Sequence, residues 1–83
     1  MTIRTYRTSE TEAKAITDNY RRFILRDEKQ HVKEGDRISF CVMKEGKPVL
    51  NKIDKHNYIV TSVINEMQAP IRKGFILIEF REV

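Results

Sequence analysis

The sequence predicts a mainly β domain of the α+β class, an antiparallel β-barrel of about five to six strands with one short N-terminal helix. Two observations predict it. The chain has 83 residues, enough for one compact domain spanning residues 1–83. One helix signal near the N-terminus is followed by several short β-branched or alternating segments that turn signals separate. Because so small a domain buries little apolar surface, we expect a shallow cleft rather than an enclosed site.

The N-terminal part is expected to form a short strand over 2–7, with Ile3 facing inward, and then a helix of about two to three turns. Ser9 and Glu12 have the spacing of a capping box, in which Ser9 accepts from the first turn and Glu12 reaches back three residues. Asn19 is expected to end the helix, because asparagine tolerates the left-handed conformation that often follows a helix.

The remaining strands are expected over 21–26, 37–44, 47–50, 58–64 and 74–80. Side chains alternate across a strand, so Phe23 and Leu25 are expected to share one face of the first of these. Arg22, Ile24 and Arg26 then share the opposite face.

Two turn signals divide the central part of the chain. Gly35-Asp36 precedes the strand over 37–44, and Glu45-Gly46 follows it as a tight hairpin with Gly46 at positive φ. Pro48 lacks a backbone N–H, so the strand that returns from this hairpin is expected to be short and to lie at an edge of the sheet.

Composition describes a basic chain without a membrane or secretion signal. Sixteen Lys and Arg against 12 Asp and Glu give a formal net charge of +4, which favours a polyanionic partner. No apolar run approaches the ~20 residues of a membrane span, and the N-terminus lacks the apolar core of a signal peptide. Cys41 is the single cysteine. We expect it to be buried in its strand, the location to be cytoplasmic, and the chain to bind no metal and no cofactor.

The stretch from Ala15 to Arg26, followed after a polar spacer by Gly35-Asp36, resembles an ASCH domain of the PUA-like superfamily. Within that group it is similar to a small bacterial branch known only as a domain of unknown function. The family pattern is a helix, then Gly-x-Lys-x-x-Glu-x-Arg on a strand, then Gly-Asp before the next strand. The closing run from Lys73 to Ile78 is similar to the family's final Gly-aromatic-aliphatic strand. The resemblance spans most of the chain and implies a PUA-like barrel that binds RNA or nucleotides.

The family pattern departs from this sequence at one decisive position. Its Gly falls on Asn19, its Lys on Arg21 and its Arg is retained as Arg26, but its Glu falls on Ile24. In family members that resemble amidohydrolases, the Lys is a candidate activating group and a carboxylate transfers the proton. Arg21 stays protonated at any ordinary pH and Ile24 transfers no proton. The catalytic form of the site is therefore expected to be absent, unless a carboxylate from elsewhere in the chain replaces it.

We therefore expect an RNA- or nucleotide-binding module rather than an enzyme. The predicted binding residues are Tyr20, Arg21, Arg22, Ile24, Arg26 and Lys73. The arginines would engage phosphate, the tyrosine and isoleucine would contact a base, and the lysine would contribute from the start of the last strand. Two alternatives stay open. An amidohydrolase acting on an acylated or modified nucleoside requires a carboxylate beside Arg26, and a protein-interaction module would pair the strand around Pro48 with a partner.

Overall fold

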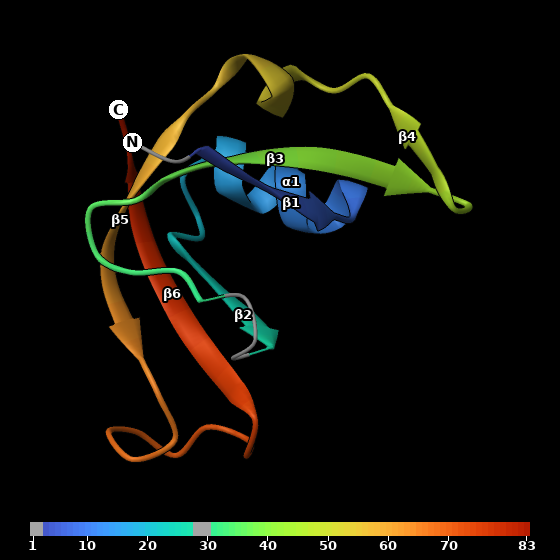
Figure 1. Cartoon of the computed structure of the whole chain (residues 1–83). Coiled ribbons are helices and arrows are strands. Elements are labelled where there is room, and N and C mark those ends of the chain that lie inside the picture. Colours follow the sequence, from blue (N-terminus) through green and yellow to red (C-terminus); the bar gives the residue numbers. More distant parts are fainter. Residues whose placement is uncertain (1–2, 28–30) are drawn as a thin grey trace.

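The computed structural model describes residues 3–27 and 31–83 (Figure 1). Its elements, in chain order, are β1 (Ile3–Thr8), α1 (Glu10–Thr17), β2 (Phe23–Asp27), β3 (Arg37–Lys44), β4 (Lys47–Val49), the 3-10 helix η2 (Lys52–Lys55), β5 (Tyr58–Ile64) and β6 (Phe75–Glu82). The mainly β, α+β class with a short N-terminal helix is therefore confirmed. The short helix η2 is an addition, because no helix was expected between the strands over 47–50 and 58–64.

The strands form one mixed sheet in the order β1-β3-β5-β6-β2, with β4 paired to β3 outside this path. Every pair is antiparallel except β1 with β3, which is parallel. The prediction of an antiparallel sheet is wrong for β1, because α1 and β2 intervene in the chain and provide the crossover that a parallel pair needs. No ladder joins β1 to β2 in the described part of the chain, so the sheet is open at that seam. Closure into a barrel, which we had expected, is not seen.

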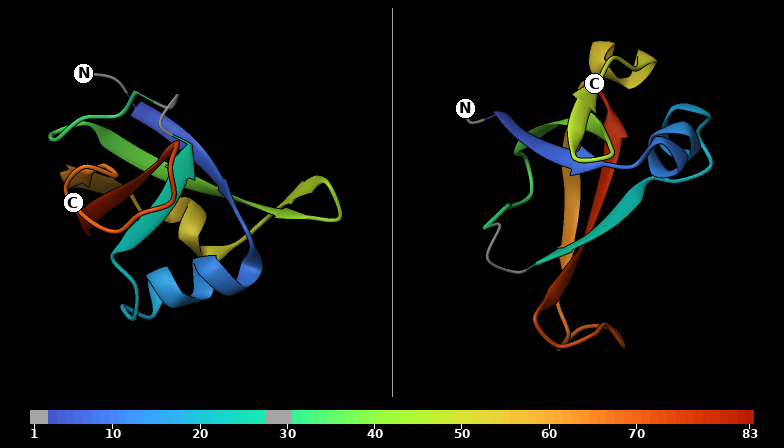
Figure 2. Two further views of the ribbon diagram at one scale, coloured as in Figure 1. Left: turned by 90° about the horizontal axis from the view of Figure 1, so that it is seen from below. Right: turned by 90° about the vertical axis from the view of Figure 1, so that its right-hand side faces the viewer.

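The sheet is strongly bent around the hydrophobic core. Figure 1 shows two arms, the β3–β4 hairpin and the β5–β6 pair, extending in different directions from a common centre. Figure 2 shows α1 connecting the end of β1 to the start of β2, so the two edge strands lead to opposite ends of one helix. The helix also contacts η2, and both lie at the same end of the sheet.

The core lies between the strands and these two short helices. Phe40, Tyr58 and Phe80 form its centre, with ring centroids 5.2 to 5.6 Å apart. Ile16 of α1 and Ile53 of η2 close one end and are fully buried. Alternate positions of the strands supply the remaining apolar side chains, as the period of a half-buried strand requires.

The alternation predicted for β2 is confirmed, but that predicted for β1 is wrong. In β2, Ile24 is 1% exposed whereas Phe23 and Leu25 are 43% and 48% exposed. In β1, Ile3 is 63% exposed and Tyr6 is buried against Phe40, so the inward face is the one that we expected to be outward. The tyrosine has the larger apolar surface, and burying it decides the orientation of the strand.

The outward-facing positions of β3 correct a second expectation. Ile38, Phe40 and Val42 are buried on one face. Cys41 lies on the opposite face and is only partly buried, because successive side chains point to opposite sides of a strand.

Local signals at helix ends and turns were read correctly in most respects. The Ser9 side chain accepts a hydrogen bond from the backbone N–H of Glu12 at 3.1 Å, which forms the first half of the capping box. Asn19 has φ of 66° and ends the helix in the left-handed conformation. In the hairpin, both Glu45 and Gly46 have positive φ, the combination of a type I′ turn.

Candidate functional site

The residues after α1 form a rigid corner that carries three of the predicted site residues. The left-handed turn lets the backbone N–H groups of Tyr20 and Arg21 both donate to the carbonyl of Ala15, at 2.9 and 3.2 Å. The carbonyl of Arg22 then accepts from Phe80 of β6 at 2.9 Å. Backbone hydrogen bonds thus join the corner to α1 on one side and to β6 on the other. We call Tyr20, Arg21 and Arg22 the arginine corner.

A carboxylate that we did not predict lies beside this corner. Glu12 Oε2 is 3.2 Å from Arg21 Nη1, and Glu12 Oε1 is 2.9 Å from Arg26 Nη2. The hydroxyl of Thr8 also donates to Glu12 Oε1. The Glu12 side chain is 18% exposed, so these contacts replace most of its water. Instead of reaching back to complete the capping box, Glu12 joins the end of β1, the arginine corner and β2.

These contacts keep Glu12 ionised. Burial alone would raise the pKa of Glu12. Hydrogen bonds from Thr8 and Arg26, with the positive charges of Arg26 and Arg21, outweigh burial and hold the pKa below its ordinary value of 4.5. At neutral pH the carboxylate therefore has no proton to give and is a weak base.

Arg26 links the two edge strands across the open seam. Besides Glu12, its guanidinium donates to the carbonyl of Arg7 in β1 at 3.0 Å and to that of Leu25 at 2.7 Å. The same group lies 5.7 Å from the ring centroid of Tyr6. Its side chain is 21% exposed. These contacts give Arg26 a structural role, which differs from the contact with phosphate that we predicted.

The other predicted site residues lie in three different places: in the core, at the arginine corner, and at the far end of β2 from that corner. Ile24 lies in the core at 1% exposure, so the predicted contact between Ile24 and a base is wrong for this conformation, because the side chain has no accessible surface. Tyr20 is 87% exposed. The Arg22 guanidinium donates to the carbonyl of Ile16 at 3.4 Å and lies 5.9 Å from the ring centroid of Tyr58.

Lys73 is separated from the arginine corner by the length of β2. In the β2–β6 ladder, Phe23 pairs with Glu79 at the corner end, and Asp27 pairs with Phe75 at the other. Lys73 lies two residues before β6, at that second end. The four register steps from Phe23 to Asp27 correspond to roughly 13 Å.

An apolar surface connects these two ends, and sequence reasoning overlooked it. We call it the outer face; it consists of Phe23 and Leu25 of β2 and Phe75 and Leu77 of β6, which point the same way because Leu25 pairs with Leu77. The guanidinium of Arg21 lies over the Phe23 ring, 5.4 Å from its centroid. The alternation of residues 21–26 predicted that Phe23 and Leu25 share a face, but it did not predict whether another element covers that face.

The far end of the outer face is hollowed. A depression of about 400 Å³ is lined by Leu25, Pro70, Ile71, Arg72, Phe75 and Leu77. There the Arg72 guanidinium lies 5.6 Å from the centroid of the Phe75 ring. The outer face therefore has a phenylalanine with an arginine against it at each end.

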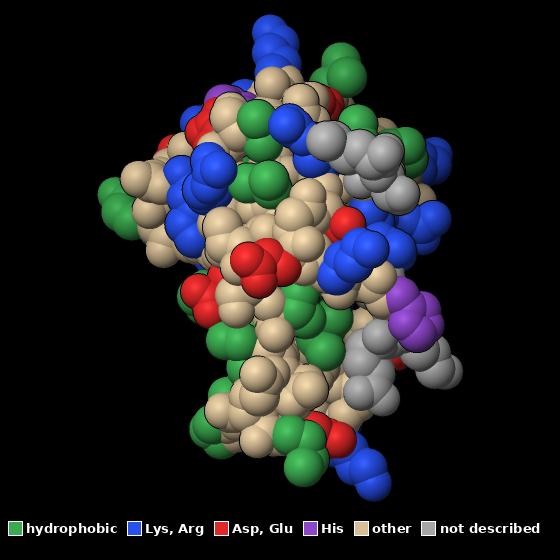
Figure 3. Space-filling model, turned by 60° about the vertical axis from the view of Figure 1, so that its left-hand side comes forward, with side chains coloured by type: hydrophobic (Ala, Val, Ile, Leu, Met, Phe, Trp, Pro, Cys, Tyr) green, Lys and Arg blue, Asp and Glu red, His purple; other side chains and the backbone are tan. Residues whose placement is uncertain are grey.

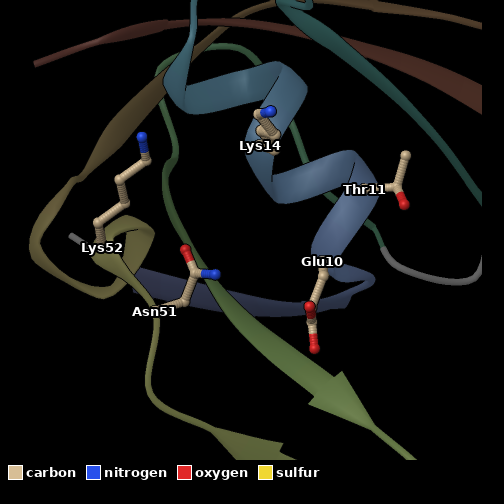
Figure 4. A pocket seen from close by; sticks show the side chains of 5 residues that line it. All are labelled: Glu10, Thr11, Lys14, Asn51 and Lys52. Carbon is tan, nitrogen blue, oxygen red and sulfur yellow. The ribbon is translucent and has the colours of Figure 1, made fainter.

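A second depression, between α1 and η2, has a different character. Figure 4 shows its lining side chains, which are those of Glu10, Thr11, Lys14, Asn51 and Lys52 around about 560 Å³. Lys52 Nζ is 3.5 Å from Asp18 Oδ1, and Lys44 Nζ is 3.6 Å from Glu10 Oε1. Because these charged groups are exposed and already paired, we assign no ligand to this depression.

Basic side chains are unevenly distributed over the surface. On the face shown in Figure 3, most Lys and Arg side chains lie in the upper half, and few are seen in the lower half, where the β5–β6 arm lies. Within residues 3–27 and 31–83, no three His, Cys, Asp or Glu side chains come together as a metal site would require. Among the same residues, every helix is too short or too polar to cross a bilayer.

No protein-family model matches the sequence, and no curated protein matches it. The resemblance to ASCH domains therefore stays a prediction.

Proposed function

We propose that this chain is an RNA- or nucleotide-binding module of the ASCH and PUA-like type, with the arginine corner as its primary binding site. The observation that carries the proposal is an excess of guanidinium groups. Within the described residues, Arg21 and Arg26 both pair with one carboxylate, that of Glu12, and Arg22 donates to the backbone carbonyl of Ile16. The three arginines therefore keep a net positive charge, and Tyr20, which precedes them in the chain, is 87% exposed.

The chemistry of the corner suits a phosphate with a base attached. A guanidinium has five N–H donors in a planar fork that matches phosphate oxygens. Arg21 uses one donor on Glu12, and its side chain is 40% exposed, so donors remain for a ligand. The ring of Tyr20 offers a flat surface on which an unpaired base can stack.

The PUA-like assignment is part of the same proposal. It is supported by the strongly bent six-stranded sheet, whose edge strands β1 and β2 are linked by the Arg26 side chain. It is also supported by the left-handed Asn19 at the position of the family's glycine, since that residue type favours the conformation.

Binding is favoured over the alternative of nucleoside hydrolysis. Glu12 does provide the carboxylate beside Arg26 that the amidohydrolase alternative requires. However, Thr8, Arg21 and Arg26 all donate to it and its pKa lies below the ordinary value. A general base works best with a pKa near the working pH, so this carboxylate is poorly suited to proton transfer.

Fluorescence anisotropy of a labelled eight-nucleotide single-stranded RNA tests the proposal. We expect affinity to fall as salt rises from about 50 to 200 mM, and the slope of the log–log plot to flatten by about 0.7 for each phosphate contact that Arg21→Gln and Arg22→Gln remove. Lys47→Gln in β4 is the matched control, because it removes the same charge from the β3–β4 arm. Absence of binding at low salt, or equal losses in the control, would overturn the proposal.

The base contact at the corner is tested separately. Tyr20→Ala should weaken RNA binding about tenfold with little change in the salt slope, because stacking contributes affinity without neutralising phosphate. Tyr20→Phe keeps the ring and should bind as the parent chain does. If both variants bind equally well, the ring of Tyr20 makes no contact with a base.

A further inference from the structure

We propose that single-stranded RNA continues from the arginine corner along the outer face, with Phe23 and Phe75 each stacking one base. This inference rests on the proposed function and names the ligand more closely, as an unpaired strand of several nucleotides rather than a duplex or a mononucleotide. It adds residues that have no part in the corner itself: Phe75, Arg72 and Lys73.

The rings of Phe23 and Phe75 are accessible on this face of the sheet. Phe23 is 43% exposed and Leu25 beside it is 48% exposed, so this face of the sheet is not covered by another element in the described part of the chain. Phe75 is partly exposed at the wall of the depression of about 400 Å³. Aromatic rings on an open sheet face are a common platform for unpaired bases, because every base has a flat π-surface.

An arginine lies against each of the two rings. Arg21 and Arg72 lie 5.4 and 5.6 Å from the centroids of Phe23 and Phe75. A ring face that admits a planar guanidinium also admits a planar base, and a base can stack on the guanidinium plane itself. Each ring thus has a cation beside it for the phosphate that accompanies the base, and Lys73 adds a further positive charge at the Phe75 end.

The spacing of the two rings requires more than one base. Phe23 pairs with Glu79 and Phe75 pairs with Asp27, four register positions apart. At about 3.3 Å per position, the rings are separated by roughly 13 Å along the strands, which is too far for one base to contact both. At least two nucleotides are therefore needed, and their bases must be turned out of any helix, which excludes a duplex.

Charge on the outer face limits where the phosphates lie. Glu79 and Asp27 are opposite the two rings and share the face with them. These carboxylates therefore lie at the two ends of the face, and its middle, at Leu25 and Leu77, is apolar. The cations lie at the same two ends, Arg21 at one and Arg72 with Lys73 at the other, so each phosphate has to contact these cations on the side away from the carboxylate.

The experiment compares two ligand lengths and two substitutions of one ring. Labelled uridine 5′-monophosphate has a single base and can be held by the arginine corner alone, whereas octa-uridylate reaches Phe75. We expect Phe75→Leu to weaken octa-uridylate binding about tenfold and to leave binding of uridine 5′-monophosphate unchanged. Phe75→Tyr keeps a stacking surface and should bind both lengths as the parent chain does. Leucine keeps an apolar side chain but has no ring. Comparing Phe75→Leu with Phe75→Tyr therefore distinguishes base stacking from hydrophobic contact.

Each outcome is decisive. If both lengths bind and Phe75→Leu has no effect on either, the outer-face path is wrong while the proposed function stands. If neither length binds, the proposed function fails as well. If Phe75→Leu instead abolishes a concentration-dependent dimer in sedimentation velocity, the outer face is a protein interface and the inference is overturned. Phe23→Leu, at a more exposed ring, repeats the test should Phe75→Leu lower the thermal midpoint.

Discussion

Glu12 shows at the scale of single residues how one side chain can be diverted from a local role to a tertiary one. Its backbone N–H is capped by Ser9, as the spacing predicts, but its carboxylate turns to Arg21 and Arg26. A charge-assisted pair with two guanidinium groups is stronger than a hydrogen bond to a neutral backbone N–H, which explains the choice. As a result, the Glu12 carboxylate holds the side chains of Arg21 and Arg26 in place.

Glu12→Gln should lower the free energy of unfolding by about 2 kcal/mol at pH 7, because two guanidinium groups lose a largely buried charged partner. Glu10→Gln is the matched control in the same helical turn. Its ion pair with Lys44 is exposed at both ends, so we expect a change of less than about 0.5 kcal/mol. Urea denaturation of the three proteins measures the difference, and equal effects of the two substitutions would contradict the role given to Glu12.

The contribution of Glu12 to stability should also depend on pH. The pKa of Glu12 is lower in the folded chain than its ordinary value of 4.5, so the folded state favours the ionised form. The stabilisation is fully present above that ordinary value and is lost as pH falls through the folded pKa. The gap in unfolding free energy between the parent chain and Glu12→Gln should hold between pH 7 and 5 and shrink in more acidic solution. A gap that widens in acid would show that the sign is wrong.

Asn19 offers a test of the turn that positions the arginine corner. Its φ of 66° costs an ordinary L-residue about 1–2 kcal/mol, and glycine nothing. Asn19→Ala should therefore lower the thermal midpoint, whereas Asn19→Gly should leave it nearly unchanged. Calorimetry of both variants checks this, and similar midpoints would mean that the turn relaxes without strain.

At the scale of elements, the sequence predicted most boundaries but not every face. The strands over 37–44 and 58–64 have the predicted bounds, because β-branched runs between turn signals leave little ambiguity. The face of β1 was missed because Ile3 is the obvious apolar residue, while Tyr6 is the one that the core of the whole molecule requires. The parallel pairing of β1 and the placement of Glu12 beside Arg26 depend on contacts between distant segments, which no local pattern encodes.

The two faces of β2 give a paired prediction. Ile24 is fully buried, so Ile24→Ala should cost about 3 kcal/mol of unfolding free energy through lost burial and the cavity left behind. Leu25, the next residue, is half exposed, so Leu25→Ala should cost less than about 1 kcal/mol. Equal costs in denaturant titrations would mean that β2 does not have the orientation described.

At the scale of the whole molecule, a bent sheet is held together at its open seam by side chains rather than by a ladder. Arg26 on β2 reaches the carbonyl of Arg7 on β1, lies against Tyr6 and pairs with Glu12 of the helix between them. The guanidinium fork suits this position because its donors point in several directions at once. The arginine that the sequence offered as a ligand contact thus contributes chiefly to the shape of the domain.

Arg26→Lys tests this account, because lysine keeps the charge but replaces the fork with a compact ammonium that cannot meet the same acceptors together. We expect faster amide hydrogen exchange in β1 and β2 and little change in the β5–β6 ladder, since only the seam loses a link. Arg81→Lys is the control, as Arg81 is exposed and its guanidinium donates, among the described residues, to the carbonyl of the adjacent Glu82 at 3.5 Å. Exchange that rises equally in all strands would show that Arg26 stabilises the fold as a whole. Exchange that does not change would show that the two edge strands hold their positions without it.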